Sequence, residues 1–170
     1  VIDEAGRRGI RSVLLTGDRQ ENAARVGVEA GIAPAGAACL TGKTIERMAL
    51  SEVAKQSTYC SVFARLLPSQ KGVLIRLFQQ EGHRVAMIGD GPNDGIALKV
   101  ADVGISFLQN ASPVATRLCA ILVNELRDVG RLVEAGRRIK TRARYWEWFR
   151  VMMLSVALGS PYVWVASLLV

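Results

Sequence analysis

The segment from residue 85 to residue 106 constrains the fold more than any other part of this sequence. An apolar run at residues 85–88 leads into the acidic, glycine-rich loop Gly89-Asp90-Gly91-Pro92-Asn93-Asp94, and a helix-like stretch then leads to a second apolar run at residues 103–105. We therefore predict a strand, a loop, a helix and a second strand, in this order. Two carboxylates four residues apart in such a loop can bind a hard cation through oxygen atoms, and Gly89 and Gly91 allow close approach of a ligand. The segment predicts a site for Mg²⁺ and phosphate.

Two further segments supply other groups that such a site needs. An isolated Asp-Gly pair is more often an ordinary turn than a site, but this loop is not isolated. The apolar run at residues 13–15 also ends on a hydroxyl and a glycine, in Thr16-Gly17-Asp18, and Pro68-Ser69-Gln70-Lys71 places a lysine near the start of a predicted helix. Thr16 and Gly17 can donate hydrogen bonds to a phosphoryl group, and Lys71 can neutralise its charge. With Asp90 to position the metal, these segments lack only the nucleophile of a phosphoryl-transfer site.

Short apolar runs alternate with helical patterns through residues 1–125. This alternation predicts an α/β fold, namely a Rossmann-like parallel sheet with helices on both faces and ligands bound at the carboxyl ends of the strands. Thr16 and Asp90 both follow predicted strands. The predicted strands are residues 12–15, 60–64, 84–88, 103–105 and 120–123, and the predicted helices are residues 1–9, 20–30, 45–55, 69–81, 94–100 and 113–118.

Gly42-Lys43-Thr44 has the ending of a P-loop. The first glycine that this motif requires would fall at Ala37, and no strong strand pattern precedes it. We therefore predict an ordinary connection here and no nucleotide site.

The C-terminal part has a different character. Residues 151–170 form an uncharged apolar run that would be about 30 Å long as a helix, which matches the hydrocarbon thickness of a bilayer and is long for a buried core helix. Aromatic residues and a basic collar precede it, as is typical of the cytoplasmic side of a membrane span. The cations of the collar are Arg137, Arg138, Lys140, Arg142, Arg144 and Arg150. We predict a long helix at residues 126–150 and a transmembrane segment at residues 151–170.

The charge distribution bears on the partners. The net charge is +7, and residues 137–150 supply six cations against Glu147, or +5, which leaves +2 for the rest of the chain. Anionic lipid headgroups are therefore favoured as partners over nucleic acid, for which a basic face with readout residues would be expected. Cys39, Cys60 and Cys119 have no Cys-x-x-Cys spacing, and with His83 as the lone histidine the sequence predicts no zinc site.

The three motifs, followed by Ala97-Leu98 and by Ala101-Asp102-Val103-Gly104-Ile105, resemble the phosphorylation domain of P-type cation-transporting ATPases, members of the haloacid dehalogenase superfamily. The resemblance runs from about residue 1 to residue 150 and implies ATP as substrate and Mg²⁺ as cofactor. It implies that Thr16 and Gly17 bind the phosphoryl group and that Lys71 contacts the phosphate and a nucleophilic aspartate. The remaining implied residues are Asp90 as a direct Mg²⁺ ligand, Asn93 and Asp94 in the phosphate and metal shell, and Asp18, Gly89 and Gly91 in structural roles.

The sequence departs from the family pattern in three places. Pro92 stands where the family usually has an aliphatic residue, and Gly95-Ile96 stands where Ala-Pro or Ser-Pro is usual. The third departure is larger, because the Asp-Lys-Thr-Gly-Thr motif that contains the family's nucleophile occurs nowhere in the 170 residues. Covalent catalysis requires that carboxylate, so we expect this chain by itself to be catalytically silent. A start without methionine and an apolar end without a polar exit suggest that the chain is a fragment lacking the N-terminal portion of the same polypeptide.

These observations favour part of an ATP-driven cation pump that works through an aspartyl phosphate. In that case residues 1–125 form a partial phosphorylation domain, residues 126–150 a stalk helix and residues 151–170 a truncated membrane helix of a multi-pass protein, with residues 1–150 in the cytoplasm. The transported cation is not specified by these residues. Two alternatives remain open: a soluble phosphatase of the same superfamily, which shares the acidic loop, and a non-catalytic, membrane-anchored regulatory module.

Overall fold

The computed structural model describes residues 1–138. The chain divides into two units, Val1–Asp128 and Val129–Val170, and the strands and the predicted site belong to the first unit. Residues 126–138 are helical, whereas the rest of the predicted stalk helix and the whole apolar segment at residues 151–170 lie outside the described part. No helix within residues 1–138 is long and apolar enough to cross a membrane.

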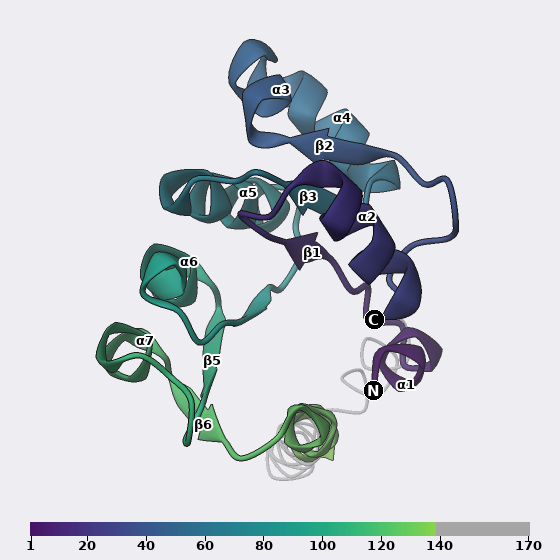
Figure 1. Ribbon diagram of the computed structural model, residues 1–170. Helices are drawn as coiled ribbons and strands as arrows, with labels where there is room; N and C mark the ends of the chain where they lie inside the picture. The colour runs from purple at the N-terminus through teal and green to yellow at the C-terminus, as the bar shows by residue number, and fades with distance from the viewer. Residues whose placement is uncertain (139–170) are drawn as a thin grey trace, which may run out of the picture. The chain divides into compact units, whose positions relative to one another are not determined.

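The first half of this unit is a parallel three-stranded sheet. Its strands are β1 (Leu14–Leu15), β2 (Cys39–Thr41) and β3 (Val62–Ala64), in the order β1-β3-β2. Phe63 points from β3 into a core formed with residues of the helices on one face, while Val62 and Ala64 point to the other face and pack with Ala23. The sheet is therefore covered on both faces, as predicted (Figure 1). The helices of this half are α1 (Ile2–Arg7), α2 (Gln20–Glu29), α3 (Gly42–Arg47), α4 (Leu50–Tyr59) and α5 (Pro68–Gln80).

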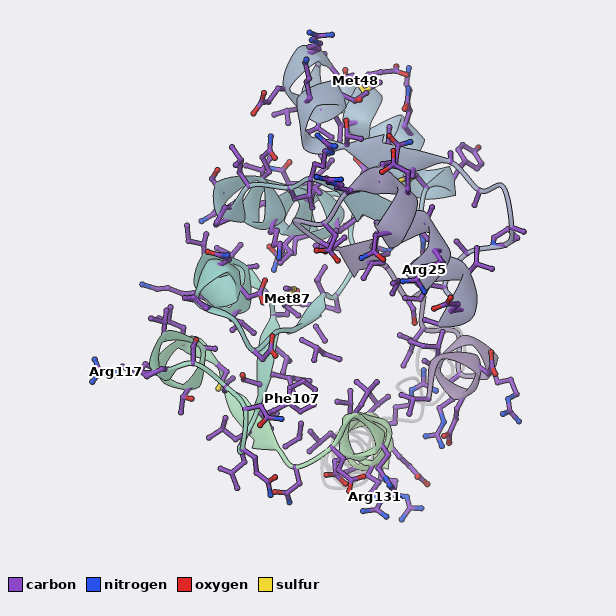
Figure 2. All side chains as sticks on the ribbon, viewed as in Figure 1. Arg25, Met48, Met87, Phe107, Arg117 and Arg131 are labelled. Atoms are coloured by element: carbon purple, nitrogen blue, oxygen red, sulfur yellow. The ribbon has the colours of Figure 1, made fainter. Side chains whose placement is uncertain are left out.

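The second half is another parallel three-stranded sheet. Its strands are β4 (Ala86–Ile88), β5 (Val103–Phe107) and β6 (Ile121–Val123), in the order β4-β5-β6. The 3₁₀ helix η1 (Pro92–Asp94) and the helix α6 (Gly95–Val100) follow β4, and α7 (Pro113–Leu118) follows β5. Helices α6 and α7 lie on the same side of this sheet (Figure 1). Met87 of β4 (Figure 2) belongs to one core cluster with Leu98 of α6 and Ile75 of α5, so α5 contributes to the cores of both halves.

The sheet is divided where we predicted it to be continuous. Strands β1 and β4 are the facing edges of the two sheets, and no ladder joins them within residues 1–138. Leu15 at the end of β1 and Val85 just before β4 each pack against both of the larger core clusters. The two edges therefore share core clusters, but no backbone ladder joins them in the described part of the chain.

Several boundaries differ from the sequence-based prediction. β2 was missed, because a strand of three residues after an Ala/Gly-rich stretch gives little periodicity. The predicted helix at residues 45–55 is two helices, α3 and α4, separated by Met48 and Ala49 in extended backbone. A short strand precedes Gly42-Lys43-Thr44 although the sequence shows no strong strand pattern there, because β2 ends at Thr41. The Thr41 hydroxyl accepts a hydrogen bond from the Thr44 N–H and caps α3, so this segment is a helix start.

Candidate phosphoryl-transfer site

Two of the sequence-predicted segments follow strands that face each other across the divided sheet. Thr16 comes directly after β1, and Gly89 and Asp90 come directly after β4. Both sheets are parallel, so these residues lie at carboxyl ends of strands, where α/β proteins bind ligands. The expected placement of Thr16 and Asp90 is therefore what the structure shows.

The closest contact between predicted site residues is an ion pair between Lys71 and Asp94. Lys71 Nζ lies 2.6 Å from Asp94 Oδ1, and the two side chains are only 9% and 13% exposed. Lys71 is in the first turns of α5 and Asp94 is the last residue of η1, so the pair joins two elements distant in sequence. Because burial withdraws both charges from water, loss of either partner would leave the other uncompensated. The ion pair thus places the ammonium group of Lys71 against the last residue of the acidic loop.

The acidic loop is shaped around the Asp94 side chain. A Cβ atom on Gly89 would lie 2.7 Å from Asp94 Cβ, so a residue other than glycine would displace the carboxylate. The Gly91 N–H donates to Asp94 Oδ2 over 3.4 Å, and the Asp94 N–H donates to the Gly91 carbonyl over 3.1 Å. Pro92 is the first residue of η1, where its fixed φ suits the turn and its missing N–H is not needed. The departure from the family pattern at Pro92 therefore fits the local backbone.

Asp90 and Asn93 differ from Asp94 in being exposed. The main-chain carbonyl of Asp90 accepts a hydrogen bond from the Ser112 N–H over 2.8 Å. Neither side chain has a hydrogen-bond or ion-pair partner among the described residues. Their oxygen atoms are consequently available to a ligand at the sheet edge.

The Thr16-Gly17-Asp18 segment is attached to the loop that leads into α5. The Leu66 N–H donates to the Thr16 carbonyl over 3.0 Å, and the Arg65 N–H donates to the Asp18 carbonyl over 2.8 Å. Within the segment, Thr16 Oγ1 accepts from the Asp18 N–H over 3.1 Å. These bonds fix Thr16 relative to the loop that leads into the helix of Lys71, and no hydrogen bond joins Thr16 directly to Lys71 or Asp94. The Asp18 side chain accepts a hydrogen bond from Asn22 Nδ2 of α2 over 3.0 Å.

Comparison with known proteins identifies the family of this chain. Residues 1–102 match the family model of the haloacid dehalogenase-like hydrolases. The chain belongs to this family.

Curated relatives make the resemblance to P-type ATPases explicit. A calcium-transporting ATPase of Listeria monocytogenes is 34% identical over 124 residues, which is 73% of this chain and 14% of that protein. A calcium-transporting ATPase of Bacillus subtilis is 30% identical over 145 residues, or 84% of this chain and 16% of that protein. The magnesium-transporting ATPase, P-type 1, of Salmonella typhimurium is 39% identical over 117 residues, or 69% of this chain and 13% of that protein. The resemblance is confirmed, and this haloacid dehalogenase-like chain spans about one seventh of the Listeria relative.

The haloacid dehalogenase-like site offers some, but not all, of the ligands that a Mg²⁺ ion needs. No group of three or more His, Cys, Asp or Glu side chains suited to a metal ion occurs within residues 1–138. Mg²⁺ is commonly bound by only one or two carboxylates, with water and phosphate oxygens at its other positions. The exposed Asp90 and the neighbouring Asp94 match that donor set. The residues present therefore fit part of a Mg²⁺ coordination shell.

Three residues around the haloacid dehalogenase-like site had no role predicted from the sequence. Arg65 has φ of 50°, a left-handed conformation that is rare outside glycine and that no pattern signals. The Gln70 amide donates to the Gly42 carbonyl over 3.1 Å and thereby ties α5 to α3. Ser106 is fully buried and its hydroxyl donates to the Gly89 carbonyl over 2.7 Å. Its one signal in the sequence is a polar residue in an otherwise apolar strand.

The family motif around Asp102 forms a structural contact at the opposite ends of the strands. Asp102 accepts hydrogen bonds from the Val85 N–H at 2.9 Å, from Gln79 Nε2 at 3.0 Å and from Arg84 Nη1 at 2.8 Å. The Val85 N–H contributes most, and with Gln79 and Arg84 it holds the pKa of the Asp102 carboxyl well below its usual range. Asp102, just before β5, thus forms a hydrogen bond that connects it to Val85, just before β4.

Proposed function

We propose that this chain supplies the phosphate-binding and Mg²⁺-binding residues of an ATP-driven cation pump that works through an aspartyl phosphate. The observation that carries the proposal is the buried Lys71–Asp94 ion pair at 2.6 Å, beside an acidic loop at a strand end. The similarity to cation-transporting ATPases supports the pump as its setting.

Each residue has a defined task in this proposal. Lys71 Nζ neutralises charge on the phosphoryl group, and the Thr16 hydroxyl and the Gly17 N–H donate hydrogen bonds to its oxygens. Asp90 and Asp94 hold Mg²⁺, with Asn93 beside them. Bound Mg²⁺ supplies the positive charge that offsets the charge of the transferring phosphoryl group. Asp18, Gly89 and Gly91 keep the backbone in the required shape.

The nucleophilic carboxylate must come from outside residues 1–170, in the portion of the polypeptide that precedes them in the proposed pump. Two edge strands, β1 and β4, lead to site residues, and neither has a second strand partner in the part of the chain that the structure describes. A strand that pairs with both edges would complete one parallel sheet. It would also deliver a side chain between Thr16 and Asp90, which is where the proposed transfer requires the nucleophile.

The soluble phosphatase is the second candidate, and the family match to residues 1–102 fits it equally well. The relatives favour the pump, because the matched proteins are cation-transporting ATPases and the similarity reaches 84% of this chain in one of them.

The pump proposal also includes a membrane part. It comprises the stalk helix at residues 126–150, the membrane segment at residues 151–170, the lipid contacts and the cytoplasmic location of residues 1–150. A glycosylation reporter fused after Val170 should be modified inside microsomes, and one placed before Arg137 should not.

The direct test measures acid-stable phosphoenzyme formed from ATP by the complete natural polypeptide that contains this chain. Asp90→Asn should abolish Mg²⁺-dependent labelling because it removes a charged ligand, whereas Asp3→Asn, at an exposed position in α1, should leave labelling unchanged. Residues 1–150 alone should incorporate no label. Undiminished labelling of the Asp90→Asn protein at saturating Mg²⁺ would refute the assignment of the loop.

A further inference from the structure

Three buried polar side chains occur in the described part of the chain: Ser57, Lys71 and Ser106. Lys71 pairs with Asp94, and the Ser57 hydroxyl donates to the Ala54 carbonyl of its own helix over 2.7 Å. Ser106 is different because it reaches out of β5 to another element. Its hydroxyl donates over 2.7 Å to the carbonyl of Gly89, the first residue of the acidic loop.

Gly89 is the point in the loop where the backbone needs such a constraint. A side chain is excluded there, since a Cβ atom would lie 2.7 Å from Asp94 Cβ. Glycine satisfies this steric requirement, but it also gives the peptide that follows it wide rotational freedom. The Gly89 N–H is bonded to the Ile105 carbonyl at 3.1 Å, which fixes the preceding peptide and leaves the Gly89–Asp90 peptide to be fixed by other contacts.

The bond from Ser106 determines which way the Gly89–Asp90 peptide faces. This peptide is trans, as are all the peptide bonds of the described chain, so its C=O and N–H point in opposite directions. With the Gly89 carbonyl turned toward buried Ser106, the Asp90 N–H points away from the interior of β5. Rotation of the peptide would turn a carbonyl dipole toward an anionic ligand and would move the Asp90 side chain. On the other side of Asp90, the Ser112 N–H holds the Asp90 carbonyl at 2.8 Å.

We propose that Ser106 is a positioning residue for the metal and phosphate loop, which sets the orientation of the Gly89–Asp90 peptide and thereby the direction of the Asp90 carboxylate. This role rests on the proposed function of the loop as a Mg²⁺ site. Residues that orient metal ligands without touching the metal typically change metal affinity by about 10- to 100-fold when they are replaced. Ser106 meets that description because it is fully buried and acts through a single backbone carbonyl.

The test uses the complete polypeptide that contains this chain and measures Mn²⁺ binding by electron paramagnetic resonance without nucleotide, together with the thermal midpoint. Ser106→Ala should weaken Mn²⁺ binding by about 10-fold or more. Ser57→Ala is the matched control, because it removes a bond of the same type and length from a buried serine in α4. It should lower the thermal midpoint comparably and leave the Mn²⁺ dissociation constant unchanged. Ser106→Thr should restore Mn²⁺ affinity, although its extra methyl group lowers the thermal midpoint.

The outcomes separate this role from the assignment of the loop. If Asp90→Asn weakens Mn²⁺ binding and Ser106→Ala does not, the positioning role is refuted while the loop remains a metal site. If Asp90→Asn leaves Mn²⁺ binding unchanged, the proposed function fails first. Equal Mn²⁺ affinities of the Ser106→Ala and Ser57→Ala proteins would show that the Ser106 hydrogen bond contributes only to the stability of the core. A parallel rise in the Mg²⁺ concentration for half-maximal phosphoenzyme, confined to Ser106→Ala, would support the role.

Discussion

The two three-stranded sheets of the first unit present different chemical groups at the carboxyl ends of their strands. The β1-β3-β2 sheet has apolar clusters on both faces, and the site groups at its edge, Thr16 and Gly17, are uncharged hydrogen-bond donors. The β4-β5-β6 sheet carries the carboxylates of Asp90 and Asp94. Helix α5, which packs into the cores of both sheets, places the cation Lys71 against the carboxylate of the second. Each half thus carries part of the proposed site, and the helix between them supplies the positive charge that neither sheet edge has.

A core mutation tests whether helix α5 couples the stability of the two sheets. Phe63 in β3 is fully buried, with its ring centroid 6.3 Å from that of Phe78 in α5, so Phe63→Ala should lower the free energy of unfolding by about 3–5 kcal/mol. Because α5 also packs against the second sheet, hydrogen exchange should accelerate in β5 as well as in β3. Exchange in β5 that stays at the wild-type rate would show that the halves open separately.

A second mutation tests the ion pair that joins α5 to the second half. Lys71→Met should cost about 3–5 kcal/mol in chemical denaturation, because it leaves Asp94 charged and unpaired in a site where its side chain is only 13% exposed. Adding Asp94→Asn should recover part of this loss, and the double-mutant cycle should give a coupling energy above about 0.5 kcal/mol.

The exposed pair between Arg25 and Glu29 is the control for that cycle. Its charged atoms are 2.7 Å apart, but the side chains are 61% and 60% exposed. Arg25→Met should therefore change stability by at most about 1 kcal/mol. Equal effects at the buried and the exposed pair would mean that burial of the Lys71–Asp94 pair has no energetic consequence.

The smallest expected effect concerns the opposite ends of the strands in the second half. Since the pKa of Asp102 is lowered in the folded state, the ionised carboxylate stabilises the fold above its usual pKa, and this contribution is lost as the pH falls below about 4. Asp102→Asn should lower the thermal midpoint at pH 7 and should reduce its further decline between pH 5 and pH 3. Parallel pH profiles of the two proteins would contradict the prediction.

The sequence predicted the elements that carry strong local signals. Pro113 at a helix start and the apolar runs of β4 and β5 gave boundaries within two residues of those observed. The loops that contain Thr16 and Asp90 follow strands, because each connection between parallel strands begins with a loop at the carboxyl end of a strand. Local patterns do not determine strand pairing, so the division between β1 and β4 could not be read from them.

The contacts that build the site depend on tertiary structure, and this limited what could be predicted. The Lys71 and Asp94 motifs were identified, but the 2.6 Å contact between these residues was not. The resemblance gave Lys71 a phosphate and a nucleophile as partners, and in this chain its partner is Asp94. The contact of Ser106 and the backbone of Arg65 could not be predicted, because neither a buried hydroxyl nor a left-handed conformation produces a periodic pattern in the sequence. The roles of the site residues in phosphoryl transfer remain predictions.

Helix α5 is held at two points along its length by the same part of the molecule. Lys71 near its start contacts Asp94, and Gln79 near its end donates to the Val100 carbonyl at 3.1 Å and to Asp102 at 3.0 Å. These two attachments are separated by about 12 Å along the axis at the α-helical rise. A helix fixed in this way acts as a rigid strut that connects the carboxyl ends of the strands to their amino ends. If Lys71 binds a phosphoryl group as proposed, a shift of α5 along its axis would move Gln79 together with Lys71, and the carboxyl and amino ends of the strands would be mechanically coupled through this helix.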